Sequence, residues 1–180
     1  EAVPDARSVV DLFSGTSRVG HALKATGRLV RANDHTAYAH ALARCHVQAD
    51  AARVHDAASL ALAEMVAAPP RENWFTRLYC EESRYLHPEN GVRIAGMRAW
   101  LAAHQASLDG DVYAVVLVAL LEAADRVDST AGVQMAYLKQ WSPRALRAVS
   151  PRLPALLPGP GEAHALDALD AARLLDGDLT

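Results

Sequence analysis

The sequence predicts an α/β fold in which a small parallel sheet is interrupted by a helical insertion. An apolar run over residues 9–13 breaks at Gly15 and passes directly into a helical pattern. A second apolar run, Leu29-Val30, leads to Asp34, at about the 20-residue spacing of a nucleotide-binding βαβ unit. Between residues 88 and 141 the apolar positions repeat at helical spacing, and no strand pattern is convincing.

Three parallel strands are expected, at residues 8–13, 28–33 and 162–167. The third ends in Asp167, which precedes a short helix over residues 168–175. Ligands of such sheets bind at the carboxyl ends of the strands. Three strands alone leave the sheet layer unfinished, so strand edges and apolar faces stay uncovered unless further strands complete it.

The intervening residues are expected to be mainly helical. Residues 51–68 are helical or irregular and end at Pro69-Pro70, because proline cannot continue a helix. Pro88 suits a first helical turn. Asp111 is expected to cap the next helix, whose apolar run at residues 112–121 is predicted to be the buried centre of a helical subdomain.

We divide the chain into four segments. Residues 1–68 form a cofactor-binding βαβ unit, and residues 69–141 form a helical insertion. Residues 142–161 form a proline-rich basic connector, and residues 162–180 return to the core as its third strand and helix.

Composition excludes several classes of protein. The chain has 180 residues, 51% of them hydrophobic, and a net charge of −3, which argues against a disordered or strongly basic protein. Its two cysteines do not make a disulfide framework, and its longest apolar stretch is too short to span a membrane. We therefore expect a soluble, cytoplasmic protein without membrane association.

A metal site is not expected. Several histidines lie close in sequence to Cys45, but their spacings match no common zinc arrangement. The residues concerned are His35, His40, His46 and His55.

The chain resembles the D12 class of adenine-specific DNA methyltransferases. These enzymes transfer a methyl group from S-adenosylmethionine to the exocyclic amine of adenine. The resemblance covers nearly the whole chain and includes two blocks that a generic nucleotide-binding fold has no reason to carry. The matching segments are a cofactor turn at residues 11–20, an acidic motif at 33–35, and the blocks at 84–94 and 121–141.

The sequence also departs from this family. Its turn reads Gly15-Thr16-Ser17 where members usually show Gly-x-Gly, a change that costs little provided that Ser17 is not left-handed. The catalytic Asp-Pro-Pro-Tyr motif and the amino-terminal Ile-Gly-Ser-Lys type of motif do not occur in it. We therefore expect an interior fragment, for which no catalytic residue can be named.

The resemblance implies a Rossmann-like S-adenosylmethionine-dependent methyltransferase core with an incomplete parallel sheet. The segment Phe13, Ser14, Gly15 and Thr16 would approach the methionine part of the cofactor, and Asp11 would order the turn or reach the amino group. Asp34 would accept hydrogen bonds from the ribose hydroxyls, the alternative being a solvated strand-end acid. Asp167 would bind the adenine amine, the alternative being a helix cap.

The implied partner is double-stranded DNA with its target adenine flipped out of the helix, and the resemblance makes the helical insertion at residues 69–141 a candidate DNA-recognition subdomain. The basic stretch over residues 139–152 contains no acid, and it is either a DNA contact or a solvated connector. Arg84, Arg93 and Arg98 either position the DNA backbone or are ordinary exposed arginines. A restriction endonuclease is a further candidate partner. The predicted nucleic-acid-binding residues are Tyr137, Lys139, Trp141, Arg144 and Arg147.

The leading hypothesis is therefore that the chain is part of a site-specific DNA adenine methyltransferase. The alternative is a catalytically inactive remnant that binds nucleic acid or a partner. A nicotinamide dehydrogenase would share the βαβ unit but not the two family blocks. We expect the 180-residue chain alone not to methylate DNA, and to be poorly soluble or loosely folded.

Overall fold

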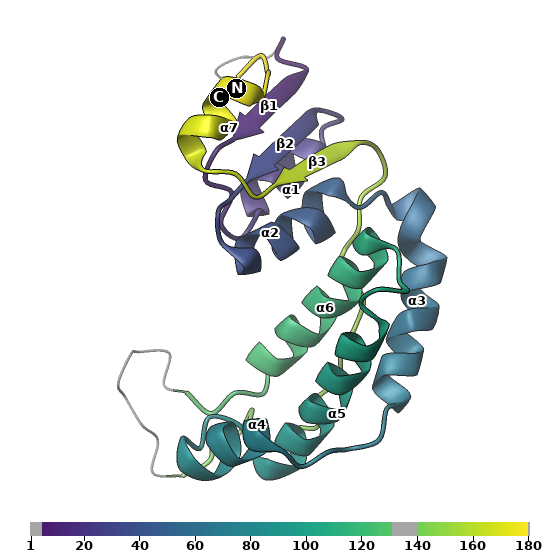
Figure 1. The fold of residues 1–180 in the computed structure, drawn as a ribbon, viewed down its shortest axis with the longest axis vertical. Coiled ribbons are helices and arrows are strands. Elements are labelled where there is room, and N and C mark those ends of the chain that lie inside the picture. Colours follow the sequence, from purple (N-terminus) through teal and green to yellow (C-terminus); the bar gives the residue numbers. More distant parts are fainter. Residues whose placement is uncertain (1–4, 131–139, 180) are drawn as a thin grey trace. The chain divides into compact units, whose positions relative to one another are not determined.

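The computed structural model of the chain describes residues 5–130 and 140–179 (Figure 1). The chain forms two compact units. The core unit comprises residues 1–59, 109–118 and 153–180, and the helical unit comprises residues 60–108 and 119–152. Two long helices, α3 (Ala51–Ala67) and α6 (Gly110–Asp125), contribute residues to both units. The four functional segments proposed from the sequence stay a prediction.

The core unit contains the predicted three-stranded parallel sheet. Strands β1 (Ser8–Asp11), β2 (Leu29–Asn33) and β3 (Gly161–His164) lie in the order β1-β2-β3 (Figure 1). The α/β prediction is therefore confirmed. β1 and β3 end earlier than predicted, because the residues after Asp11 and His164 belong to loops at the carboxyl edge of the sheet.

Helices pack on one face of this sheet. Val30 and Ala32 of β2 are fully buried in a cluster with Ala43 and Val47. These contacts involve α1 (Arg18–Lys24), α2 (Ala37–Ala43) and the π-helical turn η1 (Arg44–Gln48). Lys24, the last residue of α1, is buried, and its Nζ donates to the Val47 and Ala49 carbonyls at 2.7 and 2.8 Å. Burial lowers the pKa of Lys24.

The other face of the sheet carries charge. Because side chains alternate along a strand, Arg31 points away from the Val30–Ala32 side. Its Nε lies 3.1 Å from Glu162 of β3, and the same guanidinium donates to the Asp176 carbonyl, which follows α7 (Ala168–Leu174). The chain then runs beside β1, where the Val10 N–H donates to the Leu179 carbonyl at 2.8 Å. That edge of β1 is therefore in contact with the segment after α7.

The helical unit also follows the predicted pattern. Residues 51–68 are mostly helical, since α3 ends at Ala67, just before the two prolines. Short helical turns follow, α4 (Trp74–Thr76) and the π-helical η2 (Arg77–Glu82). The next helix, α5 (Pro88–His104), begins with Pro88 in its first turn, as predicted.

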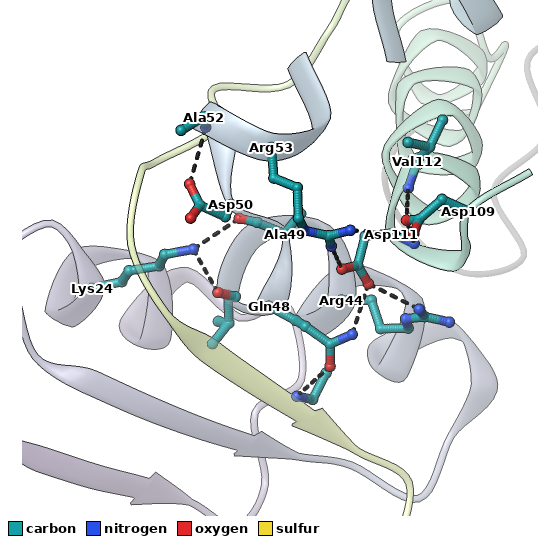
Figure 2. A network of polar contacts seen from close by, with 12 residues as sticks. Lys24, Arg44, Gln48, Ala49, Asp50, Ala52, Arg53, Asp109, Asp111 and Val112 are labelled. Carbon is teal, nitrogen blue, oxygen red and sulfur yellow. Dashed lines mark hydrogen bonds and ion pairs between the residues drawn. The ribbon is translucent and has the colours of Figure 1, made fainter. Parts of the chain in front are cut away.

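The prediction that Asp111 caps α6 is wrong. Asp109 is the cap, because its Oδ1 accepts hydrogen bonds from the N–H groups of Asp111 and Val112. The Asp111 side chain is buried and instead binds Arg44, at 2.8 Å, and Arg53 (Figure 2). Most apolar residues of α6 are buried, as predicted from a helix that is apolar almost all round, while Leu117 and Leu121 are half-buried. The first half of α6, up to Val118, belongs to the core unit and not to the helical unit.

Gln48 extends this network to the sheet. Its Nε2 donates to Asp111 Oδ1 at 2.7 Å, and its Oε1 accepts from the Ala163 N–H of β3 at 3.0 Å (Figure 2). Asp111 thus fixes the first turn of α6 against η1, and Gln48 joins both to β3. A buried carboxylate is tolerated here because Arg44, Arg53 and Gln48 all donate to it.

Candidate functional site

The predicted cofactor turn lies at the carboxyl end of β1. Gly15 has a φ of 50° and Ser17 a φ of 58°, both in the left-handed region. Glycine adopts this conformation freely, whereas a serine pays about 1–2 kcal/mol. We expected serine in place of glycine to cost little only if Ser17 were not left-handed, and this condition is not met. Beside the turn, the Phe13 side chain is 78% exposed, an apolar surface available to a ligand.

Asp34 connects this turn to the end of β2. Its Oδ2 accepts a hydrogen bond from the Gly15 N–H at 3.0 Å, while Oδ1 accepts from the Thr36 N–H and hydroxyl. These bonds, first of all that from the Thr36 backbone, lower the pKa of Asp34. The carboxylate is charged at neutral pH and partly exposed. A carboxylate has about four acceptor positions, so Asp34 retains capacity for a ligand.

Sequence reasoning assigned no role to Asn33, which holds this edge together. Its Nδ2 donates to the carbonyls of Leu12 and Leu166 at 3.2 and 3.1 Å, and its Oδ1 accepts from the Leu166 N–H at 2.9 Å. Its carbonyl accepts from the Ser14 N–H at 2.9 Å. Asn33 is 1% exposed and bonds to the loops after β1 and β3. The sequence feature that could have indicated this role is an amide side chain at the end of an apolar strand.

Asp11 and the turn serines have unusual surroundings. Burial raises the pKa of Asp11, the Phe13 backbone opposes this, and the charge of Asp34 adds to the rise. In the described part of the chain the buried hydroxyls of Ser14 and Ser17 have no hydrogen-bond partner. The turn therefore contains polar groups that the protein leaves unsatisfied, a feature that fits a polar ligand.

Asp167 lies at the same edge as a helix cap. Its Oδ1 accepts from the Leu169 N–H at 2.8 Å at the start of α7, which is the alternative role considered for it. Its neighbour Leu166 is the residue that Asn33 holds. The structure therefore brings Asp34, Asp167 and the turn at residues 13–16 to one edge, where Asp34 is partly exposed and Asp167 and the Phe13 ring are exposed.

The predicted nucleic-acid-binding residues differ in their surroundings. Tyr137 and Lys139 lie outside the described residues. Trp141 is half-buried, and the Arg144 guanidinium is committed to an ion pair with the buried carboxylate of Asp128. Arg147 is exposed and forms no ion pair with any described acid.

The described residues contain neither a cluster of metal ligands nor a membrane-spanning helix. No group of three or more histidine, cysteine, aspartate or glutamate side chains is placed to hold a metal ion. Within residues 5–130 and 140–179, no helix combines the length and apolarity needed to cross a membrane.

Comparison with known proteins identifies the family. The family model for D12 class N6 adenine-specific DNA methyltransferases matches residues 1–157. The chain is 33% identical over 171 residues to the Type II methyltransferase M.NlaIII of Neisseria lactamica, an alignment that covers 92% of this chain and 50% of that protein. The chain thus spans about half the length of this relative. No solved structure matches it significantly. The match over most of the chain, together with the parallel sheet and the anchored acid at its edge, shows that the chain belongs to the D12 class of N6 adenine-specific DNA methyltransferases.

Proposed function

We propose that the chain supplies the cofactor-binding core and part of the DNA-binding surface of a site-specific DNA adenine methyltransferase. The observation that carries this proposal is the placement of Asp34. Its carboxylate is fixed by Gly15 and Thr36 at the carboxyl edge of the sheet, yet stays partly exposed. Ligands of open α/β sheets bind at this edge.

S-adenosylmethionine, when bound, supplies an electrophilic methyl group. Asp34 accepts hydrogen bonds from the ribose hydroxyls, for which a charged carboxylate is the strongest acceptor in a protein. The segment Phe13 to Thr16 holds the methionine portion, with Asp11 ordering the turn or meeting the amino group. Asp167 binds the adenine amine through acceptor capacity that its cap does not use.

The substrate is an adenine flipped out of duplex DNA, since its exocyclic amine is not accessible for this chemistry inside the stack. Tyr137, Lys139, Trp141 and Arg147 are proposed to contact this DNA, and Arg144 to support that contact. Arg144 contributes by holding the connector to Asp128, because its guanidinium is already engaged there. We also propose that the protein has a restriction endonuclease as a partner and that it is cytoplasmic.

Methyl transfer and cofactor binding are tested separately. The 180-residue chain and a longer chain carrying an Asp-Pro-Pro-Tyr motif are compared for binding of S-adenosylmethionine by calorimetry and for transfer of labelled methyl groups to duplex DNA. We expect the short chain to bind cofactor, and only the longer chain to methylate adenine. Transfer by the short chain would place the catalytic groups among its own residues. A longer chain that binds no cofactor would contradict the proposed function.

A further inference from the structure

Two segments that are distant in sequence are joined in the helical unit by one buried side chain. Asn90, in the first turn of α5, is 4% exposed. Its Nδ2 donates to the carbonyls of Ala145 and Arg147 at 2.9 and 2.8 Å, and its Oδ1 accepts from the Val149 N–H at 2.9 Å. The family block at residues 84–94 and the acid-free connector therefore form one continuous, fixed surface.

A cavity of about 340 Å³ opens on this surface. Its polar lining residues are His87, Glu89, Asn90, Arg93 and Arg147, and residues 145, 146, 148 and 149 complete it. Arg93 is held in place because its Nη2 donates to the Val66 carbonyl at 3.0 Å. Neither arginine forms an ion pair with any acid that the structure describes, and the lining carries two arginine charges against one glutamate, which leaves an excess of positive charge.

An aromatic and cationic stack borders the cavity. The Arg84 guanidinium lies over the Trp141 ring, 4.9 Å from its centroid, and the His87 ring meets the same indole edge-on at 5.1 Å. His87 belongs to both the stack and the cavity wall. Arg84 is exposed and has a φ of 52°, a conformation that arginine rarely adopts. Its guanidinium therefore belongs to a stack that shares His87 with the wall of the cavity.

We propose that this cavity binds a phosphate group of the DNA backbone through Arg93 and Arg147, with the Arg84–Trp141 stack contacting the adjoining nucleotide. The inference rests on the proposed function for its ligand. Two guanidinium groups suit the oxygens of a phosphodiester, and an arginine stacked on an indole offers both charge and a flat apolar surface to a nucleotide. The contact is independent of sequence, so it positions the DNA and does not read it.

The test measures the affinity of the chain for a fluorescently labelled duplex by anisotropy over a series of salt concentrations. Arg147→Gln removes one phosphate contact, so the slope of log affinity against log salt should fall by about 0.9, and the affinity by roughly fivefold to tenfold at 0.1 M salt. Arg93→Gln should lower the slope and the affinity by similar amounts. Both effects should also be seen with a duplex of unrelated sequence, because the contact is independent of sequence. Arg77→Gln is the matched control, because Arg77 is exposed in the same unit but is paired with Glu82.

Thermal melting of each variant shows whether it is folded, and Arg147→Gln decides the matter if Arg93→Gln unfolds. An unchanged slope in folded Arg147→Gln overturns the inference, as does weakened binding of inorganic phosphate with no change in DNA binding. Cofactor binding is measured on the same samples. If the chain binds S-adenosylmethionine but Arg147→Gln leaves its DNA affinity unchanged, only this inference is overturned. A chain that binds DNA through Arg147 but binds no cofactor contradicts the proposed function alone.

Discussion

Asn33 and Leu166 exchange a pair of hydrogen bonds although 133 positions separate them in sequence. The Asn33 Nδ2 donates to the Leu166 carbonyl at 3.1 Å, and the Leu166 N–H donates to the Asn33 Oδ1 at 2.9 Å. The loop after β3 is thereby fixed to the end of β2. Because the same amide also binds Leu12, its geometry sets the spacing of the loops that carry Phe13 and Asp167.

Asn33→Asp should weaken both folding and cofactor binding. The variant keeps an acceptor for Leu166 but places a carboxylate against two buried carbonyl groups that lose their donor. We expect a loss of about 1–3 kcal/mol in the free energy of unfolding, measured by denaturant titration, and weaker binding of S-adenosylmethionine by calorimetry.

Asn90→Asp is the control for this variant. Asn90 is equally buried and has the same pattern of two donated bonds and one accepted bond, but it lies in the helical unit. It should lower stability by a similar amount and leave cofactor affinity unchanged in the folded protein. Equal effects of the two variants on affinity would show that Asn33 has no positioning role.

Asp34→Ala should cost about 1.5–3 kcal/mol in cofactor binding, the range for hydrogen bonds to a charged group. Calorimetry with S-adenosylmethionine measures the loss, and Asp170→Ala, an exposed acid of α7, serves as the control. Wild-type affinity in Asp34→Ala would rule out the ribose role.

Ser17→Gly should stabilise the chain by roughly 1 kcal/mol. The change relieves a left-handed serine and removes a buried hydroxyl without a described partner, and the greater entropy of glycine in the unfolded chain offsets part of the gain. Gly15→Ala, at the other left-handed position of the turn, should have the opposite sign. Denaturant midpoints check both, and a destabilised Ser17→Gly would mean that the hydroxyl has a structural role.

Stability should fall on acidification partly because of Asp109. Its hydrogen bonds, first of all that from the Asp111 N–H, lower its pKa in the folded state. A group with a depressed folded pKa contributes stability that is complete above its unfolded pKa, about 3.9, and is lost as the pH falls through the folded pKa. Unfolding free energies measured between pH 2 and 6 should depend less on pH in Asp109→Asn than in wild type. Parallel curves would contradict this assignment.

The sequence by itself determined the fold class, the main strands and helices and the identity of the family. Apolar runs predicted the three strands, helical spacing predicted α5 and α6, and Pro88 marked the start of α5 correctly. For residues 51–68 the sequence left a helix and an irregular segment open, and the structure shows the helix α3. These features are local, because periodicity and backbone restrictions act within a few residues.

Only the tertiary structure decided which polar groups act together. The sequence predicted Asp111 as a cap, but the preceding Asp109 caps α6 and Asp111 pairs with Arg44 and Arg53. The bridging role of Asn33 and the joining of α5 to the connector by Asn90 depend on partners dozens of residues away. A buried polar side chain must find whichever donors and acceptors the fold places within about 3 Å. Those neighbours are set by packing of the whole chain, so they cannot be predicted from local sequence patterns.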